Sequence, residues 1–169
     1  MRDDRHRWDA PQRLDAPLES RGLRLSSLPL ERQVFVSGPS VLTQMPVPVV
    51  AWPDPVFEDS YALALRRDRV LWVNGPEIAD GWDPSSGQAV SNMSDGFEAY
   101  ELSGEAAFEL LKRGTEITLG EPSGSVIRLL FGLEVFVYRY RDEATYRLHV
   151  NAAQSDALIK HLRAACAQL

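Results

Sequence analysis

The sequence predicts an α+β fold in which two main helices pack on an antiparallel or mixed sheet. Short runs of alternating apolar and polar residues recur along the chain, which is the pattern of strands that bury one face. Two stretches, residues 103–113 and 151–169, have apolar residues at helical spacing. From Phe97 the order is strand, helix, strand, strand, strand, helix, which is typical of a ferredoxin-like split βαβ arrangement.

Composition narrows the class of protein. The 169 residues are 44% hydrophobic and 25% charged, the balance of a globular chain that can build its own core. The net charge of −6 argues against a nucleic-acid partner, because such partners select basic surfaces. No apolar run approaches the roughly 18 residues of a membrane span, and the N-terminus lacks the apolar segment of a secretory signal. Cys166, the one cysteine, can form no disulfide within the chain. We therefore expect a cytoplasmic protein with no membrane or nucleic-acid partner.

The N-terminal third has the weaker signals. We expect residues 1–20, which are charged and aperiodic, to form a flexible arm, and residues 21–169 to form one α+β domain that is best supported over 61–169. Residues 22–26 and 32–37 alternate as strands do. Residues 38–55 contain five prolines and predict an extended crossing or edge segment, whose apolar side chains still cover part of the core.

The central region predicts a hairpin and two further strands. Residues 61–66 and 69–73 are short strand-like runs joined by Arg67 and Asp68. Asn74-Gly75-Pro76 predicts a turn, and residues 79–87 predict a loop rich in Gly, Asp, Pro and Ser. Residues 88–93 and 97–102 are predicted strands on either side of a Ser-Asp-Gly turn.

The C-terminal half contains both predicted helices. Ser103 is the expected N-cap of a helix over 103–113, and Gly114 is expected to end it in a left-handed conformation. Strands are predicted over 125–131, 134–140 and 145–150, and Asn151 is expected to cap a last helix that runs to Leu169.

One predicted strand has aromatic residues along a whole face. Phe136, Tyr138 and Tyr140 lie opposite Val135, Val137 and Arg139. Since one face belongs to the core, the other is covered either by the same domain or by another chain, because amphipathic aromatics suit both environments. Both alternatives stay open from the sequence.

A search for reactive residues yields no catalytic, cofactor-binding or metal-ligating residue. His6 lies in the predicted arm, and we interpret His149 and His161 as surface or boundary histidines. Cys166 falls on the apolar stripe of the last helix, which indicates a buried, inert thiol. The glycine-serine loop at 120–125 lacks the lysine and the helix of a phosphate-binding loop, and is interpreted as a strand connection. The acidic pairs Asp80 with Asp83 and Asp142 with Glu143 are interpreted as solvated turns.

Four ordered segments nevertheless resemble a known family. They are Leu71-Trp72-Val73-Asn74-Gly75-Pro76-Glu77, Tyr100-Glu101-Leu102-Ser103-Gly104 before a helix, Leu110-Leu111-Lys112-Arg113-Gly114, and Tyr146-Arg147-Leu148-His149-Val150 before the final helix. In order and spacing they are similar to segments of the γ subunit of heterotetrameric sarcosine oxidase, so the chain resembles a divergent member of that family. The resemblance covers roughly residues 61–169 and implies a fold like part of the folate-binding domain of aminomethyltransferases.

The resemblance implies a function without chemistry in this chain. It suggests a non-catalytic structural subunit that binds no cofactor itself and docks on larger oxidase subunits. The complex as a whole would use FAD, FMN, NAD and tetrahydrofolate. The alternative is a free-standing folate-binding or one-carbon-transfer domain related to aminomethyltransferases. A third hypothesis is an interaction module with no metabolic role.

Overall fold

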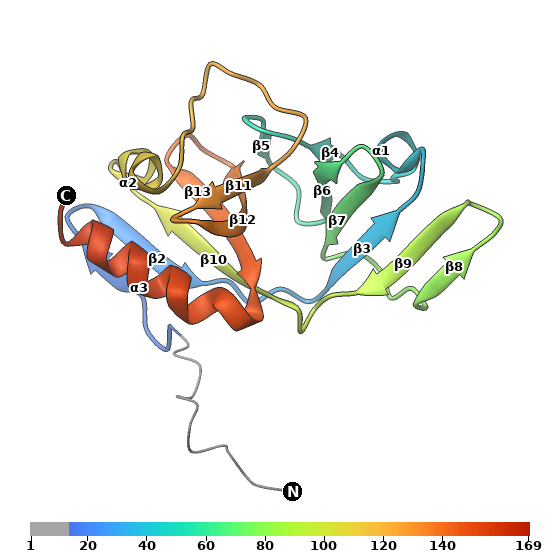
Figure 1. Ribbon diagram of the computed structural model, residues 1–169, viewed down its shortest axis with the longest axis horizontal. Helices are drawn as coiled ribbons and strands as arrows, with labels where there is room; N and C mark the ends of the chain where they lie inside the picture. The colour runs from blue at the N-terminus through green and yellow to red at the C-terminus, as the bar shows by residue number, and fades with distance from the viewer. Residues whose placement is uncertain (1–13) are drawn as a thin grey trace, which may run out of the picture.

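The computed structural model describes residues 14–169, and it contains two sheets and three α-helices (Figure 1). His6 and most of the predicted arm lie outside the described residues. Within the described part, Leu14 is buried and Leu18–Ser20 forms strand β1. Residues 14–20 therefore belong to the folded part of the chain.

The first sheet contains the C-terminal strands. Its spatial order is β1 (Leu18–Ser20), β2 (Leu23–Ser27), β10 (Phe97–Ser103), β13 (Thr145–Asn151), β12 (Leu133–Tyr140) and β11 (Ile127–Leu130), with β5 (Pro55–Val56) beside β12. Strands β10 and β12 are both antiparallel to β13, so they run parallel to each other on its two sides. This is the predicted split arrangement. Strand β11, which was also predicted, lies in the chain between the first of the two main helices and β12.

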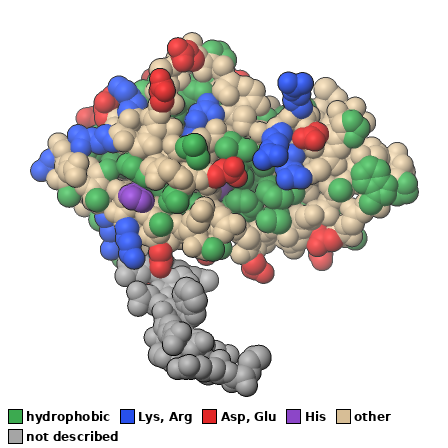
Figure 2. Space-filling model, in the orientation of Figure 1, with side chains coloured by type: hydrophobic (Ala, Val, Ile, Leu, Met, Phe, Trp, Pro, Cys, Tyr) green, Lys and Arg blue, Asp and Glu red, His purple; other side chains and the backbone are tan. Residues whose placement is uncertain are grey.

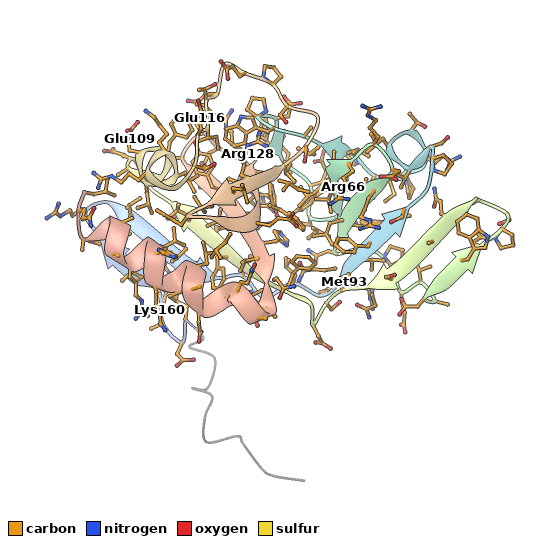
Figure 3. The ribbon with its side chains drawn as sticks, viewed as in Figure 1. Arg66, Met93, Glu109, Glu116, Arg128 and Lys160 are labelled. Carbon is orange, nitrogen blue, oxygen red and sulfur yellow. The ribbon has the colours of Figure 1, made fainter. Side chains whose placement is uncertain are left out.

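The second sheet is built from the middle of the chain. Its order is β4 (Val49–Val50), β6 (Tyr61–Arg66), β7 (Arg69–Val73), β3 (Gln33–Ser37), β9 (Gln88–Asn92) and β8 (Gly81–Asp83). The predicted hairpin is present as β6 and β7. After β9 the chain passes into the first sheet at Met93, which Figure 3 labels at this crossing.

The first sheet is covered on both faces. Helices α2 (Ala107–Gly114) and α3 (Ser155–Cys166) pack on one face, where Leu110, Leu158 and Leu162 join a core with Val135 and Val137. Exposed residues such as Lys160 occupy the outer side of α3 (Figure 3). The second sheet packs on the opposite face through a separate core, which contains the aromatic residues of β12. Of the two alternatives left open by the sequence, the first is therefore correct: the same chain covers the aromatic face of β12.

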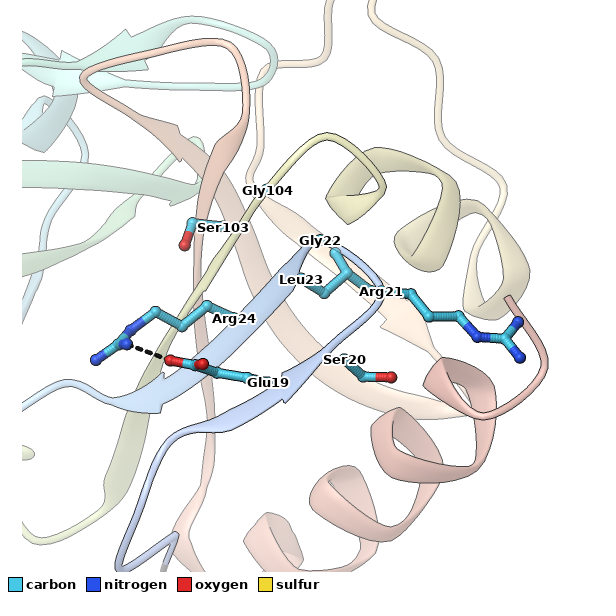
Figure 4. A pocket seen from close by; sticks show the side chains of 8 residues that line it. All are labelled: Glu19, Ser20, Arg21, Gly22, Leu23, Arg24, Ser103 and Gly104. Carbon is cyan, nitrogen blue, oxygen red and sulfur yellow. Dashed lines mark hydrogen bonds and ion pairs between the residues drawn. The ribbon is translucent and has the colours of Figure 1, made fainter.

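Helix α2 begins later than the sequence predicts. Ser103 is the last residue of β10, paired with Thr145, and the helix starts at Ala107 without a side-chain cap. Gly104 instead makes the turn with φ +119°, beside the β1–β2 turn (Figure 4). Pairing with the distant strand β13 therefore places Ser103 in β10, although the local sequence predicts it as the N-cap of the helix.

Gly114 also has a different role from the predicted one. It is the last residue of α2 and does not adopt a left-handed conformation; Thr115 follows in an extended one. A Cβ at position 114 would lie 2.7 Å from Leu130 Cδ1 and 2.7 Å from Phe131 Cζ. Close packing of the helix end on β11, rather than backbone freedom, therefore favours glycine here.

The final helix is confirmed with one addition. The Asn151 side chain accepts a hydrogen bond from Ala153 N, but it caps a short 3-10 helix, Ala152–Gln154, that leads into α3. Cys166 lies on the buried side of α3, as predicted. Burial raises the pKa of its thiol.

The structure also contains elements that the sequence pattern does not predict. The proline-rich segment forms edge strands β4 and β5 and buries Trp52, as expected of a crossing segment, but one helical turn, α1 (Val41–Gln44), lies between its prolines. The predicted loop over 79–87 contains β8, which pairs with β9.

Candidate functional site

A line of polar side chains lies buried between the two sheets. Gln33 comes from β3 and Tyr61 from β6 in the second sheet, while Tyr138 and His149 come from β12 and β13 in the first. The alternation along each strand sends these side chains to the inter-sheet face. Tyr61, Tyr138 and His149 are fully buried, and Gln33 is 4% exposed.

Hydrogen bonds connect these side chains without a gap. Gln33 Oε1 lies 2.7 Å from His149 Nδ1, and His149 Nε2 lies 2.8 Å from Tyr138 Oη. Tyr138 Oη lies 2.6 Å from Tyr61 Oη. Arg147 Nη1 then donates to Tyr61 Oη at 3.2 Å. Every buried polar atom of this line has a partner, as a stable interior requires.

The direction of the protons follows from the Gln33 end of the line and from the neutral state of His149. Gln33 Nε2 donates to the Phe97 carbonyl, which leaves Gln33 Oε1 to accept from His149 Nδ1. Burial keeps the His149 ring neutral near pH 7, so its Nε2 accepts from Tyr138, and Tyr138 in turn accepts from Tyr61. Arg147, which can only donate, then donates to Tyr61 Oη.

The protonation states agree with this direction. Burial, and then the charge of Arg147, lower the pKa of His149 to about 3. Burial raises the pKa of Tyr138 well above its usual value. Near neutral pH the line is therefore uncharged from Tyr61 to Gln33. It provides neither a strong base nor a reactive anion, and its middle members have no access to a substrate.

The only charged member of the line is Arg147, and it has its own partners. Its Nε donates to Glu101 Oε2 at 3.1 Å, and its guanidinium carbon lies 3.1 Å from the centre of the Tyr140 ring. Tyr140 Oη in turn donates to Asp59 Oδ1 at 3.2 Å, and Arg141 pairs with the same carboxylate at 2.8 Å. Arg147 thus pairs by charge with Glu101 within the first sheet and reaches the second sheet through its hydrogen bond to Tyr61.

Two cavities reach the ends of this buried line. One of about 660 Å³ is lined by Gln33, Phe97, Asp95 and Glu98, among others. The other, of about 450 Å³, is lined by Arg147, Tyr140, Asp59 and Glu31, among others. Residues 28–30, which follow β2 in the chain, line both cavities.

The residues considered in the sequence fall at separate places. The interpretation of His149 as a surface or boundary residue is wrong: it is fully buried, because the second sheet covers the polar face of β13. His161 is exposed on α3, where its ring stacks on Phe131. The Ser123-Gly124-Ser125 loop is a strand connection, as predicted, held to the second sheet by the bond from Ser125 Oγ to Leu65 O.

One member of each acidic pair holds a turn, as predicted, while Asp80 accepts a hydrogen bond from Asn92 N and Glu143 Oε1 lies 3.9 Å from Arg139 Nη2. Asp83 accepts hydrogen bonds from Ser85 and Ser86, and Asp142 accepts them from Ala144 N and Thr145. Among residues 14–169, no group of three or more His, Cys, Asp or Glu side chains is placed to hold a metal ion. Within the same residues, no helix has the length and apolar content needed to cross a membrane.

Sequence reasoning missed Gln33, Tyr61, Tyr138 and Arg147 as members of one network. A signal was present at Tyr138 alone, because its strand has apolar or aromatic residues on both faces, whereas those of the His149 strand lie on one face. Polar residues on a strand that is buried on both faces must pair with one another.

Comparison with known proteins rests on the three-dimensional fold. No protein-family model matches the sequence, and no curated protein matches it. Among solved structures, a chain of the heterotetrameric sarcosine oxidase from Corynebacterium sp. U-96, in complex with pyrrole 2-carboxylate, superposes with a TM-score of 0.68 at 17% sequence identity. The chain has the fold of a sarcosine oxidase chain. The alignment covers 89% of this chain and 87% of the other, so the two have similar lengths.

This likeness confirms the predicted resemblance at the level of the fold, and it confirms the α+β class. It also extends beyond the residues that carried the prediction, since 89% of the chain includes much of the N-terminal third. The segment Tyr146–Val150, which contributed to the resemblance, is the strand β13 that holds Arg147 and His149 against the second sheet.

Proposed function

We propose that this chain is a non-catalytic structural subunit of a heterotetrameric, sarcosine-oxidase-like complex that oxidises amines with flavin and folate cofactors. The observation that carries the proposal is the fold likeness, over 89% of the chain, to a similarly sized chain of a heterotetrameric sarcosine oxidase. We propose the cytoplasm as its location, in keeping with the sequence.

The buried network supports a structural role. Its hydrogen bonds are satisfied within the chain, from Arg147 to the Phe97 carbonyl. A network of this kind fixes how two sheets dock and orders the surface around them. A general base near neutral pH would need a higher pKa than the value of about 3 at His149, and it would need to face a cavity.

The charges around the two cavities at the ends of the buried line do not suit a cofactor phosphate, which agrees with cofactor binding by the larger chains. FAD, FMN and NAD carry phosphates, which select basic side chains or helix N-termini. The 660 Å³ cavity is lined by Asp95 and Glu98 and by no Lys or Arg. In the 450 Å³ cavity the single cation, Arg147, is already paired with Glu101 and is accompanied by Asp59 and Glu31. These linings do not fit a phosphate.

The test is co-expression with the larger sarcosine-oxidase-like chains of the same organism, followed by size-exclusion chromatography with flavin absorbance. We expect the full-length chain to elute with the flavin-containing chains at a fixed ratio. A folded monomer that never elutes with them would overturn the proposal.

A separate measurement addresses the alternative of a free-standing folate-binding domain. Titration of the purified chain with tetrahydrofolate by calorimetry is expected to show no binding in the low-micromolar range. Binding at that affinity by the isolated chain would replace the structural role with the folate-binding one.

A further inference from the structure

The outer face of the second sheet is only partly covered. Over β3, β6 and β7, residues Val36, Ala62 and Val70 are buried beneath α1 and the segment that follows it. Toward β9 and β8 this cover ends: Val90 is only partly buried, and all three residues of β8 are exposed. One end of an apolar sheet face is therefore open to solvent.

At this end lies a groove of about 520 Å³, here called the β8 groove. Val36, Trp72 and Val90 line it from the sheet, and Ile78 and Trp82 line it from the chain around β8. Trp82 is 63% exposed. Figure 2 shows hydrophobic side chains gathered at the end of the molecule where Figure 1 places β8. Exposed tryptophan beside an apolar hollow is typical of interaction sites.

The charges on the β8 groove have one sign. Asp80 and Asp83 line it, and none of its lining residues is Lys or Arg. Asp83 accepts hydrogen bonds from Ser85 and Ser86, which lower the pKa of its carboxyl group to about 2 and keep it ionised. Asp80 accepts from Asn92 N at 2.7 Å, which fixes its position.

We propose that the β8 groove is the docking site for a segment of a larger chain of the complex, one that presents an apolar side chain flanked by Lys or Arg. This inference rests on the proposed function and names the surface through which the subunit would bind the larger chain. Apolar contact provides the affinity, and the two carboxylates select a basic neighbour and steer its approach.

Charge also distinguishes this occupant from a second copy of the chain. A symmetric dimer through the β8 groove would bring Asp80 and Asp83 of two copies together, in a chain whose net charge is already −6. Like charges facing across an interface disfavour association.

The experiment measures binding of full-length variants to the larger sarcosine-oxidase-like chains of the same organism, purified as a complex that lacks this subunit. Trp82→Ala removes the anchor from an exposed position and is expected to weaken binding about tenfold or more. Asp80→Asn keeps an oxygen for Asn92 N and removes the charge, so we expect about threefold weaker binding at low salt and a smaller salt dependence.

Two other exposed apolar residues serve as matched controls. Phe57, 61% exposed, and Leu129, 67% exposed, lie outside the β8 groove. Phe57→Ala and Leu129→Ala are expected to bind within about twofold of the wild type. Thermal unfolding of each variant shows that the fold is retained.

The outcomes separate the two proposals. If the wild type binds and Trp82→Ala binds equally well, the docking site is overturned while the structural role stands. If Leu129→Ala or Phe57→Ala is the variant that weakens binding, the site is likewise overturned. If the wild type does not bind the larger chains at all, the proposed function is overturned and the docking site with it. A wild-type dimer that Trp82→Ala dissociates would assign the groove to a second copy instead.

Discussion

The phenol of Tyr138 donates its proton to Nε2 of His149 across 2.8 Å, in a part of the molecule where both side chains are fully buried. The direction of this bond follows from the Gln33 end of the network. Gln33 Nε2 donates to the Phe97 carbonyl, so Gln33 Oε1 accepts from His149 Nδ1, and the neutral ring leaves Nε2 as an acceptor. The bond requires His149 to be neutral. We therefore expect the free energy of unfolding, and its dependence on pH, to be sensitive to the protonation state of His149.

Replacing His149 should destabilise the fold strongly. His149→Ala leaves Tyr138 Oη and Gln33 Oε1 without their buried partner and creates a cavity, so we expect a loss of about 3 kcal/mol or more in the free energy of unfolding. Urea denaturation measures this loss. His161→Ala, on the exposed side of α3, is the matched control and should cost less than about 1 kcal/mol. Equal losses at the two histidines would contradict the network.

Stability should fall as the pH drops through the range in which an exposed histidine titrates. The folded pKa of His149, about 3, lies below its unfolded value of 6.5, so the unfolded chain binds the extra proton first. Its stabilising contribution is complete above pH 6.5 and is lost progressively toward pH 3. The slope is about 1.4 kcal/mol per pH unit.

The window from pH 5 to 6.5 isolates this effect, because ordinary carboxyl groups titrate mainly below it. Urea denaturation of the wild type and of His149→Gln across that window provides the comparison. The variant has no imidazole at this position and should show a much flatter profile. A wild-type profile as flat as that of the variant would show that His149 does not titrate with a lowered pKa.

Local patterns were enough to predict the hairpin of β6 and β7, strands β12 and β13, and the buried side of α3. In each of these, turn residues and periodicity act within a few positions of each other. They failed at Ser103, because pairing with Thr145, which lies far along the chain, outweighs a nearby capping opportunity. They also failed at β1, which has three residues and is too short to show a period, although it pairs with the neighbouring strand β2. They predicted β4 and β5 only as parts of an extended edge segment, because strands of two residues show no period and depend on their partners β6 and β12.

The polar network could not be predicted from the sequence for a related reason. Arg147 and His149 alternate with apolar residues in β13, and in the sequence that alternation indicates a solvent-facing side. The face is covered by a second sheet that includes β3 and β6, so the partners Gln33 and Tyr61 come from more than 80 residues away. Only the tertiary packing shows that the polar side is an interior.

Arg147 should not tolerate lysine. Lysine keeps the charge, but it lacks the planar fork that donates to both Tyr61 and Glu101 and lies over the Tyr140 ring. We expect Arg147→Lys to cost about 1–2 kcal/mol in unfolding free energy, measured by urea denaturation. Arg141→Lys is the control, because the Arg141 pair with Asp59 is exposed and should contribute less than about 1 kcal/mol. A cost at Arg141 as large as that at Arg147 would contradict the role assigned to Arg147.

Gly104, in the turn between β10 and α2, should not tolerate a side chain. Its φ of +119° is unfavourable for any residue with a Cβ, and a Cβ there would collide with the carbonyl oxygen of Gly22 in the β1–β2 turn (Figure 4). We therefore expect Gly104→Ala to lower the free energy of unfolding by about 3 kcal/mol or more and to lower the thermal midpoint. Gly120→Ala is the matched control, because a Cβ at Gly120 meets no atom within 4 Å and its φ lies outside the left-handed range. Its stability should stay within about 0.5 kcal/mol of the wild type. If Gly104→Ala proved as stable as Gly120→Ala, the close approach of the two turns would be wrong, and with it the docking of β1 and β2 beside the start of α2.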